Sequence, residues 1–283
     1  MDTHSQISLQ EERSWFRKGA PPDIPKTMHE VIKPGEIITT KKPTPTKWRV
    51  LEVLSEFEHQ SGKEDGEQGS PSYAALKLLC EDAKDSNIEA LMRIYLQIPY
   101  TSTEFMESTT RATQATKFKP LELEAHQALS KDKRTSVCTP TLLGYDELQQ
   151  GQSGLVPGGF LTYVVYEFIQ GFPLADYSGH ATAFWKLPSA QRDLVRKAFK
   201  ETILGMIGNV RRVGYWPSYA SQSNLVWQPN TQNLFFVGFR SCRKVKETPW
   251  DETWLPLFEP IKAPPHSMRS GPGRYGDPSK WEY

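Results

Sequence analysis

Apolar and polar residues alternate along the first part of the chain with the two-residue period of a β-strand. The pattern predicts a strand over residues 48–57 and a hairpin of strands 73–80 and 89–100, joined by the polar turn EDAKDSNI. Alternate side chains of a strand share one face. In the 89–100 strand one face carries Met92, Ile94, Leu96 and Ile98, and the other carries Leu91, Arg93, Tyr95 and Gln97. The first, uniformly apolar face is expected in the core.

Helical and strand periods are mixed in the rest of the chain. Residues 120–131 contain good helix formers, and residues 189–210 repeat apolar residues at i, i+3, i+4 and i+7, so both are predicted to be helices. Ser189 is expected to cap the second helix. Residues 139–169 predict another hairpin, and residues 224–239 predict two short strands around a Pro-Asn turn. These elements predict an α+β fold.

The two ends of the chain differ from the middle in composition. Residues 1–45 carry PPDIP, KPGE and KKPTPT, so we expect disorder there, apart from a short helix around residues 9–16. Residues 263–283 are rich in Pro, Gly and Ser and are also expected to be disordered. The ordered middle then divides into residues 46–168 and residues 169–262.

Several short sequence segments between residues 45 and 262 resemble one family of proteins. TYVVYEFIQGFPL at 162–174, QRDLVRKAFKETILGMI at 191–207 and SNLVW at 223–227 resemble the hinge strand, the long helix and the catalytic-loop end of the protein-kinase-like and aminoglycoside phosphotransferase-like superfamily. Together with RIYLQIPYTSTEF, TPTLLGY and FFVGFR, they resemble small fungal kinase-like proteins over residues 45–262. The resemblance implies a protein-kinase-like two-lobe fold, with an antiparallel sheet lobe bearing one helix, followed by a truncated, mainly helical lobe.

The residues that such a fold would use for chemistry are incomplete. Phosphoryl transfer needs an Asp to orient the attacking hydroxyl, an Asn and an Asp to hold Mg²⁺, and a Lys on the phosphates. The resemblance places Asn224 at the Asn, and Tyr219 stands where the first Asp is expected. The triplet that should begin with the metal-binding Asp begins with Gly238, and residues 213–241 contain no Asp or Glu. We therefore expect no catalytic residues and no metal.

The nucleotide-binding end is altered as well. In a kinase, a glycine-rich loop closes over the phosphates. The corresponding loop here, residues 58–72, contains Gly62, Gly66 and Gly69. It also contains Glu64, Asp65 and Glu67, whose charge disfavours phosphate. We interpret it as a plain loop.

Charged residues near the expected cleft have two interpretations each. Arg93 occupies the position of the phosphate-binding Lys; it could reach a phosphate, but pairing with Glu122 or Glu124 of the following helix is favoured. Lys77 lies one strand too early and is expected to be solvated. Glu167 either contacts a ligand at the hinge or caps the connection between the lobes, and the sequence leaves both open.

Uncharged residues are interpreted as structural. Asn224 could be a metal ligand, but without an Asp partner it is expected to hold its loop through hydrogen bonds to the backbone. Gly158 and Gly159 are expected in a hairpin turn, not in a phosphate cradle. Seven aromatic residues are expected to fill the space of the missing charged groups: Tyr215, Trp216, Tyr219, Trp227, Phe235, Phe236 and Phe239.

Composition narrows the classes of function. The 283 residues are 37% hydrophobic and 24% charged, with a net charge of +1 and no long basic run, which does not favour nucleic-acid binding. No apolar run approaches the roughly 18 residues of a membrane span, and we expect no signal peptide. The three cysteines and six scattered histidines form neither a disulfide nor a zinc pattern. A cytoplasmic or nuclear location is expected.

These observations predict a pseudokinase-type binding or regulatory module without competent phosphotransfer. No cofactor is expected, although weak ATP binding stays open, and the partner is an unknown protein or small molecule. An alternative is an accessory enzyme or small-molecule-binding protein of a fungal metabolite pathway, using Arg93, Glu124, Asn224 and Arg240. A third hypothesis is a plain interaction domain, because only about 40 residues follow Arg240.

Overall fold

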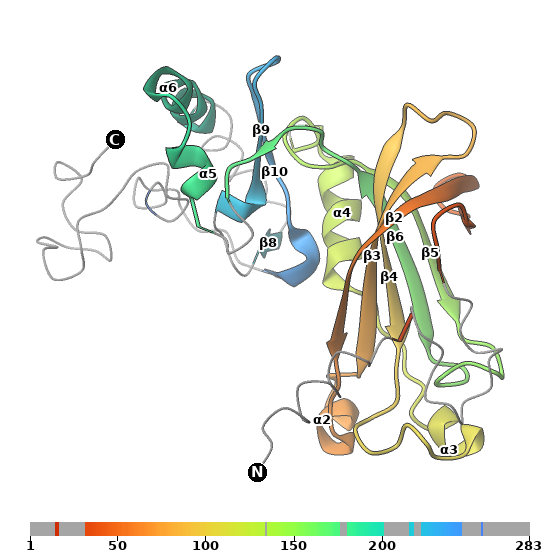
Figure 1. The fold of residues 1–283 in the computed structure, drawn as a ribbon. Helices are drawn as coiled ribbons and strands as arrows, with labels where there is room; N and C mark the ends of the chain where they lie inside the picture. Colours follow the sequence, from red (N-terminus) through yellow and green to blue (C-terminus); the bar gives the residue numbers. More distant parts are fainter. Residues whose placement is uncertain are drawn as a thin grey trace, which may run out of the picture. The chain divides into compact units, whose positions relative to one another are not determined.

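Antiparallel strands, joined by turns and helices, fall into two units of the chain, shown in the computed structural model of Figure 1. The structure describes residues 15–16, 32–133, 135–175, 180–200, 215–217, 222–244 and 256. The first unit comprises Met1–Pro120 and Leu142–Phe168, and the second comprises Leu121–Thr141 and Ile169–Tyr283. The segment 121–141 therefore groups with the second unit, whereas the sequence pattern assigns it to the first lobe.

The first unit is built on a six-stranded antiparallel sheet of order β1-β2-β3-β4-β6-β5. Its strands are β1 (Ile37–Thr40), β2 (Thr46–His59), β3 (Tyr73–Asp82), β4 (Glu89–Gln97), β5 (Leu142–Gln149) and β6 (Phe160–Glu167). The short helices α2 (Lys63–Glu67) and α3 (Ser108–Ala112) lie in its connections. The predicted β3–β4 and β5–β6 hairpins are both confirmed.

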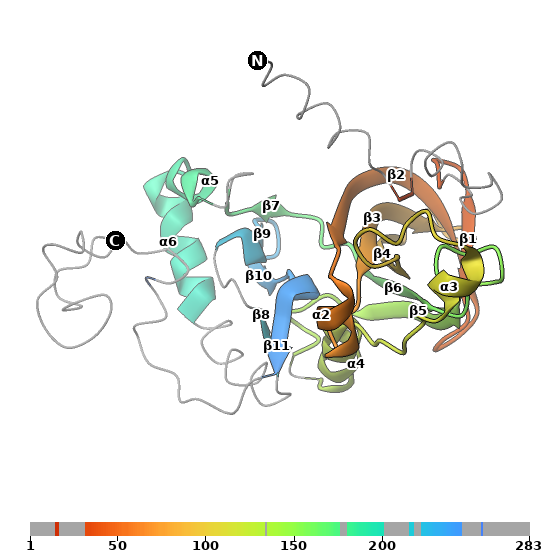
Figure 2. The ribbon, with the colours of Figure 1, turned by 90° about the horizontal axis from the view of Figure 1, so that it is seen from below.

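The sheet of the first unit closes on itself at one point. Figure 2 shows how β2 curves and brings β1 toward β5. There Lys42 and Tyr145 form a bridge in which each backbone N–H donates to the other residue's carbonyl, at 3.2 and 2.7 Å. Gly144 allows this approach, because a Cβ on it would lie 2.5 Å from Thr40 Oγ1. The two edges of the sheet are thereby joined.

Closure gives the first unit an enclosed apolar core. The core holds Trp48, Val50, Leu76, Leu78, Met92, Ile94, Ile98 and Val165. The expected core face of β4 is confirmed, but its opposite face is buried as well, including Arg93, Tyr95 and Gln97. Strand alternation predicts which side chains share a face, but only the surrounding chain decides whether a face is exposed.

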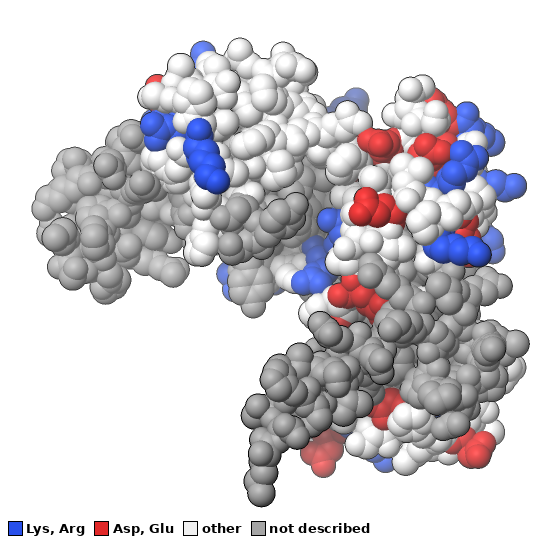
Figure 3. Space-filling view, viewed as in Figure 1, with Lys and Arg blue, Asp and Glu red and all other residues white. Residues whose placement is uncertain are grey.

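The outside of the first unit carries both signs of charge. Arg49 Nη1 of β2 lies 2.8 Å from Glu81 Oε1 of β3, and Lys42 Nζ lies 4.0 Å from Glu147 Oε2. On the face shown in Figure 3, acidic and basic side chains of this unit are intermixed. Such exposed pairs contribute about 0–1 kcal/mol each, so the enclosed core accounts for more of the stability of this unit.

In its described residues, the second unit combines short strands with helices. Its helices are α4 (Leu121–Lys131), α5 (Thr182–Trp185) and α6 (Ser189–Ala198), with the 3-10 turns η3 (Gln222–Asn224) and η4 (Phe239–Ser241). The strands are β7 (Phe172–Pro173), β8 (Tyr215–Pro217), β9 (Leu225–Gln228), β10 (Asn233–Phe236) and β11 (Cys242–Lys244). They form the sheets β10-β9-β7 and β11-β8. The predicted β9–β10 hairpin is confirmed.

The core of the second unit is rich in aromatic side chains. It contains Leu129, Phe184, Phe199, Trp227, Phe236 and Phe239. The helix α6 buries Val195 and Ala198, in agreement with its amphipathic pattern. Its N-cap is Pro188, without a side-chain cap hydrogen bond, so the expected cap at Ser189 is wrong. A proline cannot donate a backbone hydrogen bond, and its fixed φ suits a helix start.

Other sequence expectations are corrected or fall outside the described residues. Residues 32–45 were expected to be disordered but include β1, because this strand gains partners in β2 and β5 that lie far along the chain. The loop 58–72 contains α2. Several sequence predictions fall outside the described residues. They include the expected helix at 9–16 as far as residue 14, the second half of the predicted helix at 201–210, and the expected disorder of residues 263–283. Among the helices described, none has the length and apolarity needed to cross a membrane.

Candidate functional site

The candidate residues from the sequence are distributed over both units. In the first unit Arg93 lies on β4, and Glu167 ends β6. The second unit holds the others: Glu122 and Glu124 on α4, Asn224 in η3, Gly238 before η4, and Arg240 in η4. Tyr219 lies outside the described residues. Each set is therefore described within its own unit.

Asn224 and Gly238 are in direct contact at the expected metal site. Gly238 adopts the left-handed conformation, with φ 91° and ψ 45°. A Cβ placed on Gly238 would overlap Nδ2 of Asn224. The backbone holds the two segments together, since Val237 N donates a hydrogen bond of 2.7 Å to the Asn224 carbonyl. The amide of Asn224 thus occupies the space into which a side chain at position 238 would begin.

The next residue of the triplet, Phe239, is part of the core. Its ring lies edge-on to His126 of α4 at 5.6 Å and to Phe236 of β10 at 5.7 Å between centroids. Edge-to-face pairs at this spacing are favourable beyond the area that they bury. Arg240, in contrast, is exposed. Phe239 therefore packs η4 against α4, and none of the three residues of the triplet has a carboxylate.

Glu124 is held by two partners from distant parts of the second unit. Its Oε2 accepts a hydrogen bond from the Tyr215 hydroxyl at 2.8 Å and lies 2.7 Å from Lys244 Nζ. Tyr215 and Lys244 are paired residues of β8 and β11, which brings both side chains to one carboxylate. No local pattern in the sequence indicates this group, because Tyr215 is 91 residues from Glu124.

The electrostatics of this three-residue group follow from its contacts. The pKa of Tyr215 is raised by burial first, and then by the hydrogen bond and the negative charge of Glu124. The pKa of Lys244 is raised by its hydrogen bond to Glu124. At neutral pH the group is therefore a carboxylate with a phenol and an ammonium, both firmly protonated. It is suited to holding β8 and β11 on α4, not to transferring a proton near neutral pH.

Burial also affects Glu122 and Cys242 next to this group, and the cysteines elsewhere in the chain. Glu122 is only 1% exposed, and burial together with the charge of Glu122 raises the pKa of Cys242 to about 12. Burial also raises the pKa values of Cys80 and Cys138 to about 12. These thiols stay protonated at neutral pH and are poor nucleophiles. Among the residues that the structure describes, no cluster of His, Cys, Asp and Glu could hold a metal ion.

In the first unit, two cationic side chains share one face of the sheet. The register pairs Arg93 of β4 with Lys77 of β3 on one side and with Val164 of β6 on the other. Arg93 is 7% exposed, and Lys77 is half-buried, not solvated as the sequence suggests. Glu167 is half-buried opposite Ala90 at the end of β6. Strand alternation predicts this Lys77–Arg93 pair only when the register of the β3–β4 hairpin is known.

The glycines of the loop 58–72 serve packing. A Cβ on Gly66 would overlap the ring of Tyr100, whereas a Cβ on Gly62 would meet only Asp65 Oδ2 at 3.9 Å. Ser61 N donates to Ser72 Oγ at 2.8 Å, which ties the two ends of the loop together. Glu64 and Asp65 lie in the first turn of α2. The close packing and the negative charge both oppose a phosphate cradle.

Comparisons with known proteins give little beyond this geometry. No family model matches the chain, and no curated protein does. Among solved structures, the kinase PK-1 of Cydia pomonella granulovirus is similar at 14% identity and a TM-score of 0.41, over 72% of this chain and 55% of the kinase. The chain thus spans about half the length of that kinase. In the described residues, the structure shows a mixed fold of antiparallel sheets and short helices.

Proposed function

We propose that this chain is a kinase-like protein that does not transfer phosphate and that acts as a binding or regulatory module. The order of elements supports the kinase-like part: β2, the β3–β4 hairpin, α4, the β5–β6 hairpin, α6 and the β9–β10 hairpin follow the order on which the resemblance rests. The proposal includes two lobes, with residues 46–168 containing the sheet lobe and residues 169–262 a truncated second lobe.

The observation that carries the loss of activity is the contact between Asn224 and Gly238. A metal-binding Asp at position 238 would have to displace the Asn224 side chain and adopt the left-handed backbone of Gly238, with φ 91°. Tyr219 replaces the catalytic Asp in the sequence. Losing a general base costs about 10²–10⁴-fold in rate, and losing the metal removes several kcal/mol of charge stabilisation. Together these losses leave no competent centre for phosphoryl transfer.

Residues of the first unit agree with this proposal. Gly66 packs on Tyr100 and two acidic residues begin α2, so the loop is unsuited to close over phosphates. Arg93 is a permanent cation that could still contact a phosphate, together with Lys77 beside it. We therefore propose that any ATP binding is weak and needs no Mg²⁺.

A thermal shift with ATP, with and without Mg²⁺, tests the proposal. A folded-state site saturated at about 100 times its Kd adds roughly 2.7 kcal/mol of stability. We expect little or no shift, and no Mg²⁺-dependent part. Transfer from radiolabelled ATP should stay at background with protein and peptide acceptors. A Mg²⁺-dependent shift together with turnover at an ordinary kinase rate would show that the proposal is wrong.

The alternative, an accessory enzyme or small-molecule-binding protein of a fungal metabolite pathway, has less support. It needs Glu124 and Asn224 as working polar groups. Glu124 is instead held by Tyr215 and Lys244, and Asn224 is packed on Gly238. Exposed Arg240 would be left as a contact for a ligand or a protein. We propose a cytoplasmic or nuclear location with a protein or small-molecule partner.

A further inference from the structure

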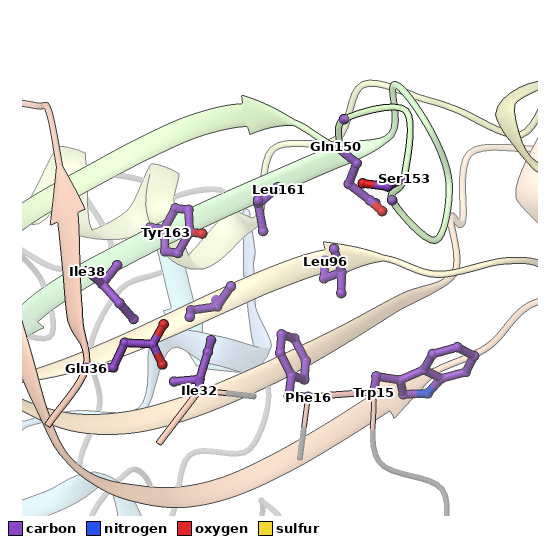
Figure 4. Close-up of a pocket in the computed structure, with 13 residues that line it drawn as sticks. Trp15, Phe16, Ile32, Glu36, Ile38, Leu96, Gln150, Ser153, Leu161 and Tyr163 are labelled. Carbon is purple, nitrogen blue, oxygen red and sulfur yellow. The ribbon is translucent and has the colours of Figure 1, made fainter. Parts of the chain in front are cut away.

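A cavity of about 440 Å³ opens inside the sheet unit, between its two edge strands. Beyond the Lys42–Tyr145 bridge, Ile38 of β1 and Gln150 after β5 line opposite ends of this cavity. Figure 4 shows Ile38 and Tyr163 at one end and Gln150 and Ser153 at the other. The volume is within the roughly 300–1,000 Å³ typical of small-molecule sites. Every lining residue belongs to the first unit.

The walls of the cavity are mainly hydrocarbon. Leu96 of β4 and Leu161 of β6 lie along its length, Ile38 lies on β1, and Ile32 and Ile94 also line it. Trp15 and Phe16 complete the wall, and Trp15 is anchored to β2, because its backbone N–H donates to Glu56 Oε1 at 2.6 Å. Such a surface favours a ligand with an apolar body, since burying its hydrocarbon is worth about 25 cal/mol per Å².

The polar groups at the rim differ in what they can offer a ligand. Gln150 is fully engaged: its Nε2 donates to the Gln97 carbonyl at 2.8 Å, and its Oε1 accepts from Val156 N at 3.1 Å. Among the residues that line the cavity, Glu36 carries the one formal charge. The Lys33 backbone N–H donates to Glu36 Oε2 over a long 3.3 Å, so the half-buried carboxylate retains acceptor capacity.

We propose that this cavity binds a small, mainly apolar amine, with its hydrocarbon along Leu96 and Leu161 and its ammonium group at Glu36. A carboxylate at the rim attracts a cationic head group and repels an anionic one. The site therefore selects amines over alcohols of the same chain length and over carboxylates most strongly. This binding site is independent of the proposed loss of phosphotransfer.

Calorimetry on the full chain tests the proposal, with decylamine, decanol and decanoate as probes below their micelle-forming concentrations. We expect decylamine to bind about 10-fold more tightly than decanol, as one charge-assisted hydrogen bond implies, and decanoate to bind weakest. Glu36→Gln should abolish the preference for decylamine over decanol. Bound decylamine should also change the fluorescence of Trp15.

Paired variants distinguish binding inside the cavity from binding on the surface of the protein. Ile38→Trp should block the cavity, whereas Ile37→Trp, at a neighbouring position that is 43% exposed and does not line the cavity, should not. If Ile38→Trp fails to fold, Ser153→Trp with the control Gln152→Trp repeats the comparison in the loop after β5. Absence of binding, equal affinity for the three probes, or equal binding by the blocked and control variants would overturn the proposal.

Discussion

The side-chain amide of Asn224 lies where a Cβ of residue 238 would lie, so Gly238 and Asn224 share one space. Gly238 also adopts a left-handed backbone that L-residues rarely take. The cost of the left-handed backbone and the cost of the contact with Asn224 can be measured separately. Gly35 has almost the same φ as Gly238, 90° against 91°, but no atom lies within 4 Å of its Cβ position.

We expect Gly238→Ala to destabilise the protein more than Gly35→Ala does. Both variants bear the left-handed backbone cost of about 1–2 kcal/mol. Gly238→Ala adds overpacking against Asn224, worth about 1–3 kcal/mol. Urea unfolding measures both free energies of unfolding. Equal losses in the two variants would mean that Asn224 yields freely and that position 238 has room for a side chain.

A double variant tests the same contact through chemistry. Tyr219→Asp with Gly238→Asp introduces the two acids that the resemblance to kinases implies, but we expect lower stability than the parent and no phosphotransferase activity. The Asp at 238 meets Asn224, and a desolvated carboxylate without a metal costs several kcal/mol or takes a raised pKa. Thermal melting and transfer from radiolabelled ATP measure the two outcomes. Unchanged melting with Mg²⁺-dependent transfer would show an intact metal site.

Tyr215→Phe should weaken the attachment of β8 and β11 to α4. It removes the hydrogen bond to Glu124 Oε2, and a hydrogen bond to a charged acceptor is worth about 1.5–3 kcal/mol, less here because Tyr215 is half-exposed. A double-mutant cycle with Glu124→Ala isolates the pair. If the coupling free energy is near zero, the contact does not stabilise the fold.

Alkaline pH should destabilise the protein through the same group. The folded-state pKa values of Tyr215 and Lys244 are raised, so their contribution is fully present below their ordinary pKa values. It is lost as pH rises through the folded-state values, above about pH 10. The buried thiols, with pKa values raised to about 12, act in the same direction from about pH 8.5 upward. Tyr215→Phe should lose less stability than the parent over the upper part of this range.

Gly66→Ala and Gly62→Ala test whether the glycines of the loop 58–72 serve packing or phosphate binding. A Cβ on Gly66 overlaps Tyr100, so we expect a loss of about 1–3 kcal/mol, whereas Gly62→Ala has room and should be neutral. Neither should alter the response to ATP. Thermal melting with and without ATP gives both results. A nucleotide response that either variant removes would instead assign the loop a phosphate-binding role.

The alternating and helical periods of the sequence were sufficient for the local elements. They predicted the β3–β4, β5–β6 and β9–β10 hairpins and the buried face of α6, because these depend on neighbours a few residues apart. The sequence also shows that residues 213–241, which include Asn224 and Gly238, contain no Asp or Glu. These results required only residue types and their spacing.

Tertiary structure decided everything that depends on distant partners. The strand β1 was interpreted as disordered because its own residues do not specify β2 and the Lys42–Tyr145 bridge that complete it. The partners of Glu124 come from β8 and β11, far along the chain. The sequence shows a Gly at position 238, but only packing shows that the Asn224 amide lies where a Cβ of that residue would lie. Residue type is local information, whereas the volume around a residue is set by the whole fold.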